Sequence, residues 1–502
     1  MPAPAVLSVS SPAEPATDVL ADRYEDLFEI LRGQGWIGID FGLAYLLYEL
    51  HGDHLRYCRA EDRWYCWTGQ RWEVDQTGEA ERKAKDVLEQ MMALDPESCC
   101  KKPRRSRQDR DGYDDEETQD AFTPASRLAR WAWESARARA PKDMLALAKV
   151  EKEMAIKPED MDSDPWLFAT ANGLLDLRTG RHRQARPCDM VSMASPVSYD
   201  PKATCPRFEA TVATLVNHDQ EMVSYLQRAL GSALCGDTRD QAIYILHGGG
   251  QNGKSTILDA VAYVLGDYAK PADPQIIMRR RERGIPLDLA RLRKSRMVTV
   301  AEPPDRVRLD ESRIKQITGG EHVIGRHLYS EEVAYKPQFK MFVATNPMPE
   351  IADMSEGMWR RIKLIECPVR IPDEKRDVLL PEKLRAEAAG ILRWLVRGCL
   401  EWQKHGLGAP AAVVEATRGY RSEMDTVEGF VASCCVREAG AKVQAGTLYK
   451  AYQEWCRGQG FEVLTDNAFG RRLSAMAESM GFEAGRSAKG NLWRGLALCD
   501  VG

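Results

Sequence analysis

From position 242 onward the chain contains short, mostly apolar runs, separated by sequence with helical spacing. The runs span 242–246, 297–301 and 341–345. Runs of this length are typical of strands buried on both faces of a parallel sheet, with helices covering them. The pattern therefore predicts an α/β fold whose core is a parallel sheet.

A glycine-rich loop stands between the first run and the helix predicted after it. Gly248, Gly253, Lys254 and Ser255 satisfy G-x-x-x-x-G-K-[ST], and helical spacing then continues as far as Gly266. In a strand–loop–helix unit the backbone amides and the helix N-terminus face phosphate groups. Lys254 would neutralise the β- and γ-phosphate oxygens and Ser255 would reach Mg²⁺. The sequence therefore predicts a nucleoside triphosphate site formed by Gly248, Gly249, Gly250, Gln251, Asn252, Gly253, Lys254, Ser255 and Thr256.

The other two apolar runs also end in polar residues that suit phosphate chemistry. Glu302 follows the second run and Asn346 follows the third. Because ligands bind beyond the carboxyl ends of parallel strands, we expect both residues to converge with Gly248. Glu302 could order Mg²⁺ and polarise the attacking water, while Asn346 contacts the γ-phosphate or that water. Ala301 stands where a second acid would sit, so one carboxylate serves both purposes or a second acid comes from elsewhere.

Arg360 and Arg361 lie 14 and 15 residues after Asn346. An arginine from a neighbouring subunit can stabilise the charge on a transferring phosphoryl group. The pair is a candidate for that role. The alternative is a pair of surface arginines in ion pairs.

Composition excludes several classes of protein. The 502 residues are 44% hydrophobic and 29% charged, and no apolar run approaches the length of a membrane span. The beginning of the sequence lacks the pattern of a signal peptide. The 13 cysteines include no C-x-x-C, which indicates reduced cytosolic thiols and no zinc ribbon. The net charge of −5 is no sign of nucleic-acid binding, although a local basic groove can act within an acidic protein.

Four segments together resemble the phage and plasmid primase-helicase family: 314–321, 325–329, 339–346 and 359–362. The motor of that family is a superfamily III helicase core of the AAA+ type, as in poxvirus primase-helicases. Upstream, 172–176, 199–201 and 226–236 resemble the helical region that precedes this core. The resemblance runs from about residue 40 to the C-terminus.

The resemblance implies a homo-oligomer, a hexameric ring that hydrolyses ATP between subunits and moves along single-stranded DNA, usually 3′ to 5′. It makes Asn346 the first sensor and Arg361, or Arg360, the finger. It makes 315–335 a hairpin that projects into the channel, with Lys315, Arg326 and His327 as DNA contacts and the last two near its tip. A primase domain has no room in this sequence, so priming is expected to be absent or to come from a separate primase.

Five regions are expected along the chain. They are a disordered tail (1–35), an accessory region with a charged linker at 96–124 (36–165), a helicase-associated helical region (166–236), the ATPase core (237–410) and a small C-terminal domain (426–502). In the last region three helices precede a basic hairpin, which suggests a winged helix with Arg471 and Arg472 on its DNA-reading third helix. The alternative for that region is a packing domain that steadies the ring.

The sequence thus favours a replicative DNA helicase of a phage, plasmid or integrated element, acting on single-stranded and forked DNA in the cytoplasm of a bacterial host. One alternative is an ATP-switched origin-binding initiator or loader that does not unwind DNA. Another is a signalling or defence ATPase built on the same core. Strand-displacement assays on forked DNA separate the three.

Overall fold

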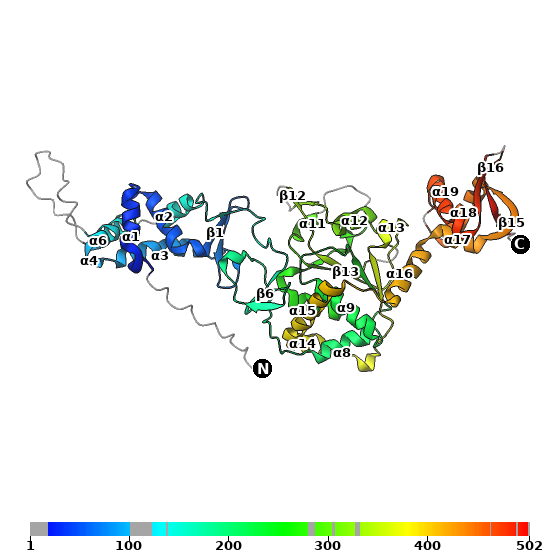
Figure 1. Ribbon diagram of the computed structural model, residues 1–502, viewed down its shortest axis with the longest axis horizontal. Helices are drawn as coiled ribbons and strands as arrows, with labels where there is room; N and C mark the ends of the chain where they lie inside the picture. The colour runs from blue at the N-terminus through cyan, green and yellow to red at the C-terminus, as the bar shows by residue number, and fades with distance from the viewer. Residues whose placement is uncertain are drawn as a thin grey trace, which may run out of the picture. The chain divides into compact units, whose positions relative to one another are not determined.

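The computed structural model describes residues 19–100, 123–136, 139–279, 287–303, 307–326, 332–461, 463–487 and 490–499. They fall into two compact units. The first comprises the chain up to Asp164 together with Arg183–Met193, and the second comprises Pro165–His182 together with everything from Ala194 onward. Figure 1 shows the helices and strands of each unit.

The first unit packs helices beside a small sheet of order β3-β2-β1-β4. The segment rich in aromatic residues forms an antiparallel hairpin, with Trp67 paired to Trp72. The strands are β1 (Leu55–Cys58), β2 (Arg63–Trp67), β3 (Trp72–Val74) and β4 (Ala155–Ile156). The helices are α1 (Val19–Gly33), α2 (Asp40–His51), α3 (Glu79–Ala93), α4 (Pro96–Cys100), α6 (Pro124–Ser135) and α7 (Ala140–Ala148).

Helix α1 corrects the expected disordered tail over 1–35. Leu20, Leu27 and Leu31 on this helix are fully buried in the core of the first unit. Their spacing of seven and four residues places them on one face, so burial of that face stabilises the helix. Residues 1–18 and most of the charged linker at 96–124 lie outside the described residues.

A five-stranded parallel sheet forms the centre of the second unit, in the order β14-β8-β13-β10-β9. Three of its strands are the predicted apolar runs, shifted by no more than one residue at either end. The strands are β8 (Ile243–His247), β9 (Ala269–Ala272), β10 (Met297–Ala301), β13 (Lys340–Thr345) and β14 (Ile362–Glu366). The predicted parallel α/β core is therefore confirmed.

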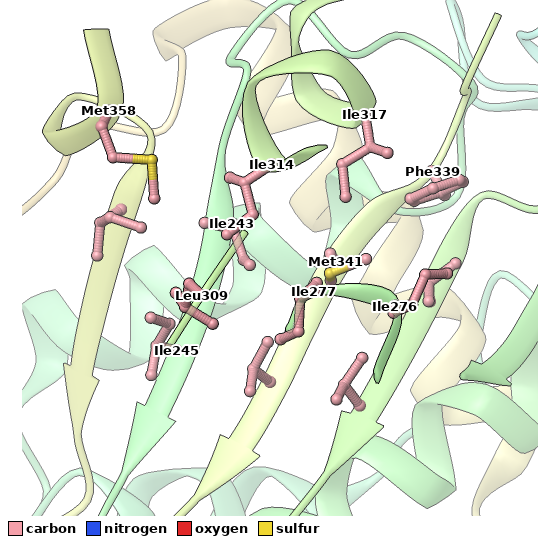
Figure 2. Packing of buried hydrophobic residues seen from close by; sticks show 14 of the residues in the cluster. Ile243, Ile245, Ile276, Ile277, Leu309, Ile314, Ile317, Phe339, Met341 and Met358 are labelled. Atoms are coloured by element: carbon pink, nitrogen blue, oxygen red, sulfur yellow. The ribbon is translucent and has the colours of Figure 1, made fainter. Parts of the chain in front are cut away.

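Alternate residues of each strand serve the two faces of this sheet. Ile243 and Met341 on one face pack under helix α12 (Glu311–Gly319), whose Ile314 and Ile317 lie over the strands in Figure 2. On the other face the rings of Tyr244 and Phe342 stack with centroids 4.7 Å apart. Burial on both faces explains why the three predicted runs are mostly apolar.

The remaining elements of the second unit come before the sheet, within it and after it. Two helices occupy the segment 380–406. Before the sheet lie β5 (Leu167–Thr170), β6 (Gly173–Asp176), β7 (Arg181–Arg183), α8 (Pro206–Leu215) and α9 (Gln220–Ser232); within and after it lie α10 (Lys254–Leu265), α11 (Leu287–Arg291), β11 (Val323–Arg326), β12 (Glu332–Tyr335), α13 (Glu356–Trp359), α14 (Leu380–Ala386), α15 (Ala388–His405) and α16 (Ala411–Met424).

The C-terminal part contains the three predicted helices and the predicted hairpin, together with a strand that the sequence analysis missed. That strand is β15, and it pairs with β17 to complete a three-stranded sheet of order β15-β17-β16. The elements are α17 (Thr426–Cys434), β15 (Cys435–Gln444), α18 (Ala445–Gln459), α19 (Asp466–Met480), β16 (Glu483–Ser487) and β17 (Gly490–Leu498). Helix, strand, two helices and a hairpin is the order of elements in a winged helix.

Helices α9 and α15 cross at glycines. A Cβ atom on Gly398 would lie 2.0 Å from the carbonyl oxygen of Gln227, and one on Gly231 would lie 2.5 Å from the amide nitrogen of Cys399. Both obstacles are backbone atoms, which cannot move aside without separating the two helices. The glycines therefore set the distance between these helices.

We expect Gly398→Ala to lower the free energy of unfolding by about 1–3 kcal/mol, because the added methyl group overpacks this crossing. Gly419→Ala is the matched control. It adds the same methyl group within α16, where a Cβ would meet nothing within 4 Å, and should be neutral or stabilise by up to about 1 kcal/mol. Denaturant titration followed by tryptophan fluorescence checks both. Equal stability of the two variants would contradict the close crossing.

Candidate functional site

The glycine-rich loop connects β8 to the N-terminus of α10, in the strand–loop–helix arrangement that its sequence predicts. Gly250 and Gly253 have φ of +86° and +89°, which side-chain-bearing residues rarely adopt. Gly248 has another reason to be glycine. A Cβ atom there would lie 2.3 Å from the carbonyl oxygen of Cys367, which follows the edge strand β14. The loop thus requires glycine for backbone conformation and for close approach.

The Lys254 side chain points into this loop. Its side chain is nearly buried, at 5% exposure, and its Nζ donates to the carbonyl oxygen of Gly248 at 2.8 Å and to Oδ1 of Asn346 at 3.1 Å. Burial lowers the pKa of this ammonium group, while nearby Glu302 acts to raise that pKa. In the described part of the chain Lys254 forms no salt bridge. A buried cation held only by neutral oxygens suits an incoming anion.

Glu302 and Asn346 lie at the same edge of the sheet as the loop, as predicted. Strand β13 separates β8 from β10, so Asn346 lies between the loop and Glu302. The amide of Glu302 donates to the carbonyl oxygen of Ala344 at 2.9 Å. Glu302 itself has φ of +46°, a strained conformation for a residue with a side chain and one that is frequent at functional sites. Both side chains are exposed.

These residues fit a magnesium–triphosphate ligand. The hydroxyl of Ser255, exposed in the first turn of α10, and the exposed carboxylate of Glu302 are the hard oxygen ligands that Mg²⁺ prefers. Within the described ranges no group of three or more His, Cys, Asp or Glu residues could hold a metal. This is compatible with Mg²⁺, which takes few protein ligands and completes its shell with phosphate and water.

Sequence reasoning missed the segment that follows β14. The amide of Cys367 donates to the carbonyl oxygen of His247 at 2.7 Å, and the amide of Ile371 donates to that of Gln251 at 2.8 Å. Asn252 is 4% exposed, and its Nδ2 donates to the carbonyl oxygen of Cys367 at 3.3 Å. The contacts join residues more than a hundred positions apart, so no local pattern could have revealed them.

The two candidate finger arginines differ in their surroundings. Arg361 is 8% exposed, and its Nε donates to Oγ1 of Thr318 at 3.0 Å within the same chain. Arg360 is exposed, and its Nη2 donates to Oε1 of Gln241 at 2.7 Å. Both precede β14, at the opposite edge of the sheet from the loop. The five residues of β8 separate them from Gly248 by about 16 Å. Neither can therefore reach the glycine-rich loop of its own chain.

The predicted channel hairpin is shorter than the segment 315–335. It consists of β11 and β12, and Arg326 pairs with Glu332 at its outermost described register position. His327 lies outside the described residues. Lys315 is not on the hairpin but on α12, where its Nζ forms an ion pair with Asp353 at 2.5 Å. Lys315 therefore lies outside the hairpin, and its DNA contact stays a prediction for a partly exposed ammonium group that already pairs with an acid 38 residues away in the chain.

Arg471 and Arg472 both lie on α19, the predicted third helix. Arg471 is exposed, whereas Arg472 is bound to Asp425 through Nε at 2.6 Å. The Asp425 side chain is only 2% exposed and also accepts from the first amides of α17. Arg472 thus neutralises a buried carboxylate, and its expected contact with DNA stays a prediction.

Comparison with known protein families confirms the resemblance found in the sequence. Residues 44–217 match the family model "D5 N terminal like", and residues 422–493 match "Poxvirus D5 protein-like". In the sequence, the two matched segments lie before and after the strands of the parallel sheet, and we therefore call the chain D5-like.

The D5-like chain is similar to proteins of large DNA viruses and of a virophage. It is 28% identical to "Putative helicase L207/L206" of Acanthamoeba polyphaga mimivirus and 24% identical to "Putative helicase 022R" of Frog virus 3, in each case over 59% of this chain. It is 21% identical to "Putative primase C962R" of African swine fever virus, again over 59% of this chain. The matches cover 33%, 39% and 34% of those relatives, so the chain spans well under half the length of each.

The relatives are viral, and they give no support to the bacterial host that we expected. A solved structure, "The A form apo structure of NrS-1 C terminal region-CTR", aligns over 89% of this chain and 97% of that chain, with 11% identity and a TM-score of 0.46. In the described part of the D5-like chain, every helix is too short or too polar to cross a membrane.

Arg472→Ala should lower the stability of the C-terminal part by about 1–3 kcal/mol, because it leaves the buried carboxylate of Asp425 without its cation. Arg471→Ala, the neighbouring exposed arginine, should change stability by less than about 0.5 kcal/mol. Rates of limited proteolysis within residues 426–502 distinguish the two variants. Proteolysis at wild-type rate in Arg472→Ala would show that the ion pair is dispensable.

Proposed function

We propose that the D5-like chain is an ATP-dependent replicative DNA helicase of a viral or other mobile genome. The observation that carries the proposal is the convergence of Lys254, Asn346 and Glu302 at one edge of the sheet, beside a loop whose glycines leave room for phosphates. A lysine, an amide and a carboxylate are the groups that hydrolysis of a phosphoanhydride requires. The viral helicases and primases to which the chain is similar support a role in DNA replication.

Each residue has a distinct part in the proposed hydrolysis. ATP would displace the carbonyl oxygen of Gly248 from the Lys254 ammonium, which then neutralises the β- and γ-phosphate oxygens. Asn346 orients the γ-phosphate or the attacking water, and Glu302 polarises that water. Mg²⁺, held from Ser255 and Glu302, supplies electrostatic stabilisation of the phosphates.

The finger belongs to a neighbouring subunit in this proposal. Arg360 is the better candidate of the pair, because its side chain is exposed while that of Arg361 is buried and bonded to Thr318. A residue that cannot reach its own loop but completes another subunit's site requires a closed ring, which we propose to be a hexamer.

DNA would be bound in two places. The hairpin of β11 and β12, with Arg326 and His327, would grip single-stranded DNA within the channel and move it 3′ to 5′. Arg471 on α19 would contact duplex DNA ahead of the fork. Strand displacement on a forked substrate tests the whole proposal. Hydrolysis of ATP without any unwinding would instead favour the initiator or loader.

Lys254→Ala should abolish ATP hydrolysis and unwinding together, because the described loop holds no other cation that can neutralise the phosphates. Lys404→Ala is a matched control, since Lys404 is 64% exposed and paired with Glu401 on α15. Phosphate release measures hydrolysis. Wild-type turnover by Lys254→Ala would refute the nucleotide site.

Arg360→Ala should keep ATP binding but lower hydrolysis by roughly 10³-fold or more, the effect typical of a missing arginine finger. Mixing it with Lys254→Ala subunits should restore part of the activity, because each supplies the half-site that the other lacks. Arg361→Ala should instead lower the melting temperature. If the Arg360→Ala and Lys254→Ala mixture stays inactive, the finger does not act in trans.

A further inference from the structure

The segment over 367–373 runs along the outer side of the glycine-rich loop and is bonded to it at both of its ends. Cys367 extends the pairing of β14 with β8, and Ile371 donates its amide to Gln251. Two side chains of the same segment also reach Gln251. Nε of Arg370 donates to Oε1 of Gln251, and Nε2 of Gln251 donates to Oδ1 of Asp373, both at 3.3 Å.

Gln251 has an unusual conformation for its position. It has φ of +50°, in the left-handed region that glycine favours and that residues with a side chain rarely adopt. Its main-chain oxygen, its amide oxygen and its amide nitrogen are all engaged by this one segment. The segment therefore holds Gln251 by several hydrogen bonds at once, and such bonds can keep a residue in a strained conformation.

Arg370 is the cation that this arrangement brings beside the phosphate loop. Its side chain is exposed, and among the described residues it forms the single hydrogen bond to Gln251 and no ion pair. A guanidinium group has five N–H donors, so the two terminal nitrogens are still available. By contrast, the exposed arginines Arg183 and Arg239 are each paired with a carboxylate. Asp373, the acid closest in sequence, binds Gln251 instead.

We propose that Arg370 is a phosphate-binding residue acting in cis. Its terminal nitrogens close over the triphosphate bound to its own loop, while Gln251 holds Nε and so fixes the direction of the guanidinium fork. Arginine suits this position because its planar fork matches two phosphate oxygens at once. The inference rests on the proposed ATP site, and it adds a second positive charge to the side of the loop opposite Asn346.

The structure distinguishes this arginine from the finger. Arg370 follows β14 at the carboxyl edge of the sheet and contacts its own loop, whereas Arg360 precedes β14 at the amino edge. Arg370 and Lys254 therefore belong to the same half-site, and Arg360 belongs to the other. Complementation between variant subunits reports directly on that assignment.

The experiment uses the full chain with ATP as the probe and compares Arg370→Ala, Arg370→Lys and Arg376→Ala. Arg376 is the matched control, because it is an exposed arginine six residues further along whose side chain bonds to nothing in the described part of the chain. We expect Arg370→Ala to raise the KM for ATP about ten- to a hundred-fold, the effect of losing a hydrogen bond to a charged group. Arg370→Lys should recover part of this, and Arg376→Ala should behave as the wild type.

Mixed rings provide the second readout. Arg370→Ala mixed with Lys254→Ala should gain no activity, because both defects fall in one half-site. Arg370→Ala mixed with Arg360→Ala should recover part of the activity. Recovery in the first mixture would overturn the assignment in cis, and an unchanged KM in Arg370→Ala would overturn phosphate contact altogether. A lower kcat at unchanged KM would mean that Arg370 only shapes the loop.

Failure of this inference is distinguishable from failure of the proposed function. If the wild type hydrolyses ATP and Lys254→Ala does not, the nucleotide site holds whatever Arg370→Ala does. If the wild type neither binds nor hydrolyses ATP, the proposed function and the inference fall together. Equal melting temperatures of Arg370→Ala and Arg376→Ala confirm that neither change acts through the fold.

Discussion

The register between β8 and its two neighbours is the constraint on which the candidate site depends. Thr345 of β13 and Glu366 of β14 both pair with His247, the last residue of β8. Each of the three strands is therefore followed at the same level by the residue that the site requires: Gly248, Asn346 and Cys367. A slip of one residue in either pair would turn alternate side chains to the wrong face and part these groups. The apolar side chains fixed in that register are what hold the site together.

Burial of a cation is the second consequence of this register. Lys254 lies under the loop because Asn346 and the carbonyl oxygen of Gly248 accept hydrogen bonds from its ammonium group. Removal of the ammonium from water lowers its pKa, so the charged state is less stable there than in solution. An arriving triphosphate would supply the missing counter-charge.

The sequence predicted the structure correctly wherever the residues of a single segment determine its fold. The apolar runs at 242–246, 297–301 and 341–345 became strands, and the C-terminal segment folded into three helices and a hairpin. Polar residues with distant partners could not be interpreted in this way. The ion pairs of Lys315 with Asp353 and of Arg472 with Asp425 join residues 38 and 47 positions apart, so no local pattern predicts them.

Elements with weak local patterns were also missed. Helix α1 follows a stretch that contains prolines and serines, and for that reason the sequence predicts a disordered tail where its buried leucines lie. Strand β15 carries an irregularity between Arg437 and Lys442, and its mixture of polar residues hides its pairing with β17. In each case tertiary packing, not local propensity, decides the structure. The contacts of Gln251 belong to this group too, since they join residues about 120 positions apart.

Strand β14 connects the two groups of residues that the proposed ring would bring to neighbouring nucleotide sites. It is five residues long, is paired along its whole length with β8, and has Arg360 and Arg361 directly before it and Cys367 directly after it. Close-packed strands move as a unit, because no part of such a strand can shift without breaking pairs or opening voids. A loop that changes shape around ATP at one end of β14 therefore acts on the same rigid element that positions Arg360 at the other. In the proposed ring, this strand would link one subunit's nucleotide to the site of the next.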